Sequence, residues 1–124
     1  MPQLDKTFPT NDCSMCILSP KLVECGKHLN IRTITNAEVM AVEGEAGDFA
    51  VTVRHNPRYI DVERCTGCGI CASRCPISAI DTFNRGLSMR AAVYIDYPQA
   101  VPLAYAIDAR RCIGCGLCAR VCPA

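Results

Sequence analysis

Two runs of four cysteines are the residues of this sequence whose type and spacing point most directly to chemistry. Each run places three cysteines at intervals of three residues and a fourth, followed by proline, four residues further on. The runs are Cys65, Cys68, Cys71 and Cys75 before Pro76, and Cys112, Cys115, Cys118 and Cys122 before Pro123. A [4Fe–4S] cluster needs one thiolate for each iron, and a C-x2-C-x2-C loop wraps three thiolates around one cluster. The spacing therefore predicts two [4Fe–4S] clusters.

The two runs belong to one repeated segment. Residues Ile60–Pro76 and Ile107–Pro123 lie 47 positions apart and share eleven of seventeen residues. In paired runs of this kind the fourth cysteine ligates the cluster of the other run. We therefore assign Cys65, Cys68, Cys71 and Cys122 to one cluster, and Cys112, Cys115, Cys118 and Cys75 to the other. Each run then completes the site of its partner.

Glycines stand between the cysteines at equivalent places in both runs, as Gly67 and Gly69 and again as Gly114 and Gly116. Glycine adopts positive φ without steric cost, and successive backbone N–H groups can then turn toward the cluster sulfurs. We expect positive φ at all four positions.

Three other interpretations of the cysteines compete with this one. Zinc sites use paired C-x2-C knuckles, in which a third cysteine at another three-residue step has no natural place. A disulfide scaffold is disfavoured because the sequence starts without a secretory signal pattern. Gly67-x-Gly69-x-x-Ala72 also matches a dinucleotide-binding fingerprint, but that pattern alone is weak evidence.

Length and charge limit the function classes. The 124 residues allow one small domain with an appended hairpin, whose core would be marginal without bound metal. The formal charge of +1 becomes about −3 once eight thiolates and two oxidised cluster cores are counted, so a nucleic-acid footprint is not indicated. There is no apolar run long enough to predict a membrane span. Eleven cysteines without an export signal favour a reduced, cytoplasmic compartment.

Periodicity predicts an α+β fold: a ferredoxin-like pseudo-twofold domain with two [4Fe–4S] clusters, preceded by a helix and an antiparallel β-hairpin. We expect the helix over Pro20–His28 and the boundary near His55–Arg58, with residues 1–56 forming an N-terminal segment and residues 57–124 the two-cluster domain. The expected strands are 31–35, 38–43, 49–54, 58–62, 77–81, 91–95 and 103–107. The last two should form a hairpin that covers one cluster.

Four further short sequence motifs support a family resemblance over nearly the whole chain. They are Gln3–Thr10 (QLDKTFPT), Asp12–Lys21 (DCSMCILSPK), Pro57–Tyr59 (PRY) and Tyr97–Pro102 (YPQAVP). Together with the hairpin, they resemble the A-type iron–sulfur flavoprotein of heterodisulfide reductase and its relatives. In that family these motifs lie inside a much longer polypeptide, where an inserted two-cluster domain interrupts an FAD domain. The chain is thus similar to an internal fragment.

The resemblance implies electron transfer within a cytoplasmic complex that contains other oxidoreductase subunits or a flavoprotein domain. It implies FAD only in a full-length or partner context, because the flavin-binding glycine loop is not found in this sequence. The chain is then an electron-carrying part of an oxidoreductase rather than a complete enzyme. An alternative is a structural and docking module whose clusters mainly hold a partner surface together.

Three cysteines lie outside the two runs. Cys13 and Cys16 could ligate a further cluster, form a redox dithiol or pack as small apolar residues, and ligation or redox use is the favoured interpretation. Cys25 is interpreted as a packing residue. His28 and His55 lack a ligand-spaced partner, so we expect them on the surface.

Overall fold

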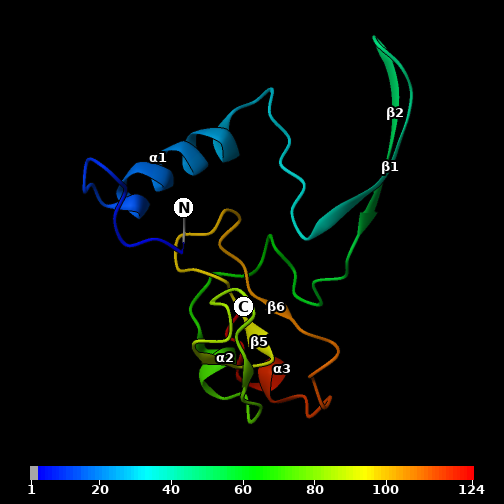
Figure 1. Ribbon diagram of the computed structural model, residues 1–124. Coiled ribbons are helices and arrows are strands. Elements are labelled where there is room, and N and C mark those ends of the chain that lie inside the picture. The colour runs from blue at the N-terminus through cyan, green and yellow to red at the C-terminus, as the bar shows by residue number, and fades with distance from the viewer. Residues whose placement is uncertain (1–2) are drawn as a thin grey trace.

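The structure is a computed structural model that describes residues 3–124. Its elements, in order, are α1 (Ser14–Lys27), β1 (Ala37–Glu45), β2 (Asp48–His55), α2 (Ile70–Ser73), β3 (Ala79–Ile80), β4 (Met89–Arg90), β5 (Val93–Tyr94), β6 (Ala106–Ile107) and α3 (Leu117–Val121). The strands pair antiparallel as β1–β2, β3–β4 and β5–β6. The predicted α+β class is confirmed. Figure 1 shows α1 and the long hairpin on one side of the molecule, with α2 and α3 together on the other.

Helix α1 begins six residues earlier than the sequence pattern predicted. Cys13 is its N-cap, with extended backbone (φ −66°, ψ 116°), and its sulfur accepts the backbone N–H of Cys16. A thiol is a weak acceptor and is not among the usual capping residues, so the start of the helix was missed. Pro20, expected in the first turn, lies inside the helix instead. Since proline has no N–H, the carbonyl of Cys16 loses its intrahelical partner there.

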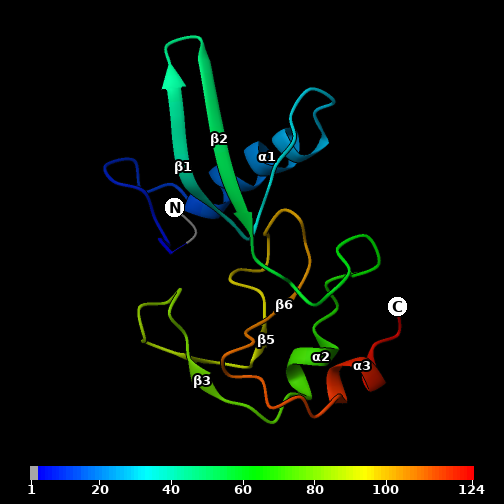
Figure 2. The same cartoon turned by 90° about the vertical axis from the view of Figure 1, so that its right-hand side faces the viewer.

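The β1–β2 hairpin agrees with the prediction and is slightly longer. Val39 pairs with Val53 and Val42 with Val51, and the register shifts by a bulge between Val39 and Ala41. The hairpin turns at Ala46 and Gly47, and Gly47 has a φ of 98° that an ordinary side chain would adopt only with strain. The hairpin projects away from the rest of the chain in both ribbon views (Figures 1 and 2), and its side chains are mostly exposed on both faces.

Two predicted strands are wrong. Residues 31–35 and 58–62 have no regular strand structure, although both sequences carry β-branched residues. The first segment leaves α1 through a turn in which Ile31 N–H donates to the carbonyl of His28. The second makes one backbone hydrogen bond to a distant segment, from Ile107 N–H to the carbonyl of Arg58. A strand needs a neighbouring strand as well as suitable residues, and neither segment finds one.

The second half of the chain contains a small core. The buried apolar residues of the described chain are Ala79, Ala92, Val93, Ala104 and Ala106. The predicted returning strand is present as the short β3, which pairs with β4. The predicted hairpin of 91–95 and 103–107 is confirmed as β5 and β6. Alanines bury little apolar surface, so this half needs metal ligation to supplement its core.

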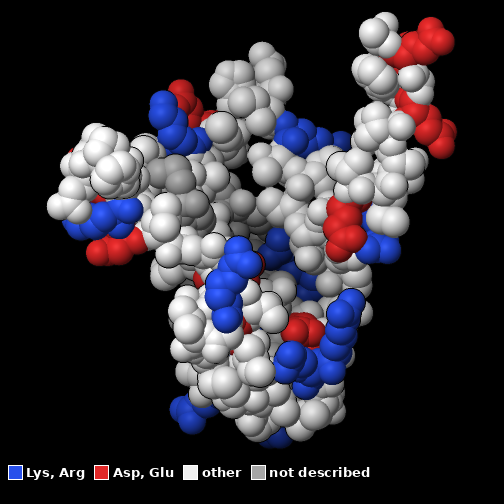
Figure 3. All heavy atoms as spheres, in the orientation of Figure 1, with Lys and Arg blue, Asp and Glu red and all other residues white. Residues whose placement is uncertain are grey.

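The surface carries charges of both signs. On the face shown in Figure 3, basic and acidic side chains are interspersed, in keeping with a formal charge of +1. None of the helices within residues 3–124 combines the length and the apolar character needed to cross a bilayer.

Candidate metal centres

Each cysteine run is introduced by a turn that an aspartate closes. Asp61 accepts the backbone N–H groups of Glu63 and Arg64 at 2.9 and 3.3 Å through its side chain, and its carbonyl accepts Cys65 N–H at 3.0 Å. Asp108, 47 residues later, accepts Arg110 N–H at 3.1 Å, and its carbonyl accepts Cys112 N–H at 2.9 Å. These local bonds fix where each loop starts, because aspartate readily bonds the backbone two residues ahead.

The glycines adopt the backbone that the loops require. Positive φ is confirmed at all four positions: 68° at Gly67, 80° at Gly69, 69° at Gly114 and 73° at Gly116. Gly69 and Gly116 are also the N-caps of α2 and α3. Each loop therefore runs directly into a short helix that carries its third cysteine.

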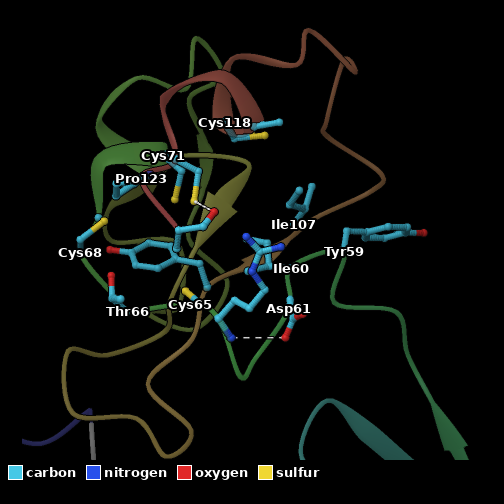
Figure 4. A pocket seen from close by; sticks show the side chains of 16 residues that line it. Tyr59, Ile60, Asp61, Cys65, Thr66, Cys68, Cys71, Ile107, Cys118 and Pro123 are labelled. Atoms are coloured by element: carbon cyan, nitrogen blue, oxygen red, sulfur yellow. Dashed lines mark hydrogen bonds between the residues drawn. The ribbon is translucent and has the colours of Figure 1, made fainter.

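Thiols from both runs line one cavity of about 370 Å³. Cys65, Cys68 and Cys71 come from the first run, and Cys122 and Cys118 come from the second. Figure 4 shows labelled members of both runs around this cavity. Helices α2 and α3 lie against each other, which carries the end of the second run to the first loop. The structure thus brings together all four residues assigned to the first cluster.

The donor set and the space suit a polynuclear cluster. All eleven cysteines are free thiols, and thiolate sulfur is the ligand that iron–sulfur clusters require. Within residues 3–124, no three His, Cys, Asp or Glu side chains converge closely enough to hold a single metal ion. Four thiols around an open cavity are the arrangement that one multi-atom cluster can fill.

The four cysteines assigned to the second cluster do not all line the cavity of the first cluster; they are Cys112, Cys115, Cys118 and Cys75. Cys118 reaches the first cavity, and Cys112 accepts the N–H of Gly114 at 3.4 Å. Among residues 3–124, no hydrogen bond joins Cys75 to Cys112, Cys115 or Cys118. Burial raises the pKa of the Cys75 thiol, but backbone N–H groups, led by that of Ile77, outweigh it and the net pKa is lowered. Those donors favour the thiolate form of Cys75.

Tyr105 is a site residue that sequence reasoning missed. Burial raises the pKa of its phenol, and so do the negative charges of Cys71, Cys68 and Cys65, in that order. The Tyr105 hydroxyl would lie 3.0 Å from a Cβ placed on Gly69. A neutral phenol therefore faces these three cysteines. Nothing in the spacing of the linker signalled this contact, which depends on how β6 folds back over the first loop.

Replacing Tyr105 with alanine should expose the first cluster. We expect the iron-dependent visible absorption of the loaded protein to decay several-fold faster in air, because the ring no longer shields the thiolates from solvent. Tyr105→Phe keeps the ring and should decay at nearly the rate of the unchanged protein. Tyr59 lines the same cavity but is largely exposed, so Tyr59→Ala serves as the control. Equal decay in Tyr105→Ala and Tyr59→Ala would contradict a shielding role.

Cys13 and Cys16 lie elsewhere. They occupy the first turn of α1, which both ribbon views place away from α2 and α3. Cys25 is exposed, so its interpretation as a packing residue is wrong. His28 and His55 are on the surface, as expected.

Comparison with known proteins supports the interpretation of the cysteine runs. Residues 64–124 match the family model of the 4Fe-4S dicluster domain, which assigns two [4Fe–4S] clusters to this part of the chain. The chain is 56% identical over 107 residues to an A-type iron–sulfur subunit of the CoB–CoM heterodisulfide reductase of Methanopyrus kandleri. It is 59% identical to the A-type subunit of the H(2):CoB-CoM heterodisulfide,ferredoxin reductase of Methanothermobacter marburgensis. It is 52% identical to the A-type iron–sulfur subunit of the CoB–CoM heterodisulfide reductase of Methanocaldococcus jannaschii.

Each of these alignments covers 86% of this chain but only 16% of the relative. The chain therefore spans about one sixth of the length of the curated proteins that it matches. The matched part extends well beyond the two cysteine runs, which account for only half of the chain. On this identity across both halves, the chain belongs to the family of A-type iron–sulfur subunits of heterodisulfide reductase.

Proposed function

We propose that the chain is an iron–sulfur electron-transfer module that relays electrons between two [4Fe–4S] clusters inside a larger cytoplasmic oxidoreductase. The observation that carries the proposal is the cavity in which thiols of both cysteine runs meet. Bound clusters supply one-electron redox chemistry. The chain's own residues hold them, direct backbone N–H groups toward their sulfurs and, through Tyr105, keep water from one side. A reduced compartment is favoured by eleven free thiols.

The proposed ligation is crossed. Cys65, Cys68, Cys71 and Cys122 hold the first cluster, and this is supported by their shared cavity. Cys112, Cys115, Cys118 and Cys75 hold the second, which follows from the repeat and from the amide donors that favour a Cys75 thiolate. A pseudo-twofold relation between the halves is part of the proposal. It is supported by the equivalent aspartate turns, glycine backbones and short helices of the two runs.

The rest of the longer polypeptide is the proposed neighbour of the N-terminal segment, residues 1–56. The relatives are about six times as long as the aligned part, and the β1–β2 hairpin exposes several large apolar side chains. These exposed residues are Val39, Met40, Val42, Phe49 and Val51. FAD would be bound only by that remaining polypeptide or by a partner subunit. The same exposed surface favours the second candidate function, a docking module whose clusters are structural.

Metal analysis of the loaded protein tests the proposal. We expect about eight irons and about eight sulfides per chain, and a broad visible absorption that dithionite bleaches. EPR of the reduced protein should show two interacting clusters. Two zinc ions and no colour would refute the cluster assignment. Clusters that are present but do not accept electrons from a reduced flavoprotein on a millisecond scale would support the docking alternative.

A further inference from the structure

The first turn of α1 holds two sulfurs in direct contact. Cys16 donates its thiol hydrogen to the sulfur of Cys13, and the two Sγ atoms are 2.7 Å apart. The backbone N–H of Cys16 also points at the Cys13 sulfur, at 3.3 Å. Both donors therefore converge on one sulfur atom. A covalent disulfide is about 2.05 Å long, so a small movement would allow the bond to form.

The two thiols are chemically unequal. The Cys16 thiol and then the Cys16 backbone N–H lower the pKa of Cys13, with a smaller contribution from the Lys6 ammonium. The same hydrogen bond raises the pKa of Cys16, because its thiol is the donor. Cys13 also stands at the N-terminus of a 14-residue helix, where the helix dipole favours a thiolate. One sulfur is thus prepared to attack, while the other keeps its proton.

The pair is also accessible and separate from the cluster cavity. Cys16 is exposed and Cys13 is partly exposed. Neither residue lines the cavity shared by the two cysteine runs. Two thiolates that bind different irons of one cluster are held apart by the cluster core, whereas these two sulfurs touch. Their geometry fits a redox dithiol better than a pair of cluster ligands.

We propose that Cys13 and Cys16 form a redox-active dithiol that an external disulfide oxidises to the Cys13–Cys16 disulfide by thiol–disulfide exchange. The Cys13 thiolate attacks one sulfur of the disulfide, forms a mixed disulfide and releases the other half as a thiolate. Cys16 then attacks the Cys13 sulfur, forms the Cys13–Cys16 disulfide and releases the second half. The two protons of the dithiol end on the released thiols. The protein loses two electrons and the external disulfide gains them, and a small dithiol reverses the reaction.

Differential alkylation of the cluster-loaded chain tests this proposal. The probe is oxidised glutathione, and Cys25→Ser serves as the background because it removes an exposed thiol outside the pair. Trypsin cleavage after Lys6 and Lys21 yields a peptide in which Cys13 and Cys16 are the only cysteines. We expect this peptide to carry two alkyl groups or none throughout the titration. The unalkylated form should have lost two hydrogens, and dithiothreitol should restore the thiols.

Single replacements separate the two roles. Cys16→Ser should accumulate glutathione as a mixed disulfide on Cys13, since the resolving thiol is absent. Cys13→Ser should react with glutathione at least about tenfold more slowly, because the backbone N–H of Cys16 and the N-terminus of α1 favour a thiolate at Cys13. Predominantly singly alkylated peptide, or unchanged reactivity in Cys13→Ser, would overturn the proposal. So would a loss of about four irons per chain in either variant, since that would make these cysteines cluster ligands. The iron content of the Cys25→Ser background tests the two-cluster assignment independently.

Discussion

Cys122→Ser should selectively degrade the cluster held by the first cysteine run. Cys122 is exposed and follows directly on α3, yet it lines the cavity with Cys65, Cys68 and Cys71. Without its thiolate, one iron loses its protein ligand and the cluster should pass to a three-iron form before it is lost. Iron should fall from about eight to about seven and then about four per chain. Deleting Val121–Ala124 should have the same effect, because metal ligation fastens this segment.

Four matched variants identify which cluster is affected. If ligation is crossed, the EPR spectrum of reduced Cys122→Ser resembles that of Cys68→Ser, and the spectrum of Cys75→Ser resembles that of Cys115→Ser. Cys25→Ser should retain both signals, since it lies in neither run. The opposite pairing, with Cys122→Ser matching Cys115→Ser, would show that each run keeps its own fourth cysteine. The ligand assignment would then have to be exchanged.

Gly67→Ala should destabilise the loaded protein much more than Gly114→Ala. The two glycines are equivalent in the repeat and have nearly the same φ, 68° and 69°, so both replacements carry a similar backbone strain of about 1–2 kcal/mol. A Cβ on Gly67 would lie 2.7 Å from Leu103 Cγ and 3.2 Å from the Leu103 carbonyl oxygen, whereas a Cβ on Gly114 meets no atom within 4 Å. Overpacking of this kind costs about 1–3 kcal/mol more.

The rate at which a chelator bleaches the visible absorption measures this difference. We expect Gly67→Ala to bleach about tenfold faster than Gly114→Ala, which corresponds to about 1.4 kcal/mol. Adding Leu103→Ala to Gly67→Ala should recover part of the loss, because it removes the side chain that is in the way. Leu103 is 47% exposed, so Leu103→Ala alone should change little. Equal bleaching of the two glycine variants would show that Leu103 moves aside without cost.

Local features of the sequence predicted local structure well. The hairpin was predicted because its alternating residues and the glycine-containing turn at residues 44–47 act on neighbouring positions. The four positive φ values followed from glycine being the residue that adopts them without strain. Predictions that needed a distant partner were less successful. Residues 31–35 have strand-forming residues but no strand beside them, and α1 starts at a sulfur cap that helix-capping preferences do not anticipate.

The chemistry of this protein is already written in its cysteines. The number, type and spacing of the cysteines specify two iron–sulfur clusters, because a loop of fixed reach can hold only certain metal groups. The surroundings of those thiols depend instead on how the chain packs. It brought Cys122 to the first loop, set Leu103 and Tyr105 over that loop and left Gly114 open, and placed the sulfurs of Cys13 and Cys16 in contact. These contacts depend on how separate segments pack, and residue spacing within one segment carries no record of that packing.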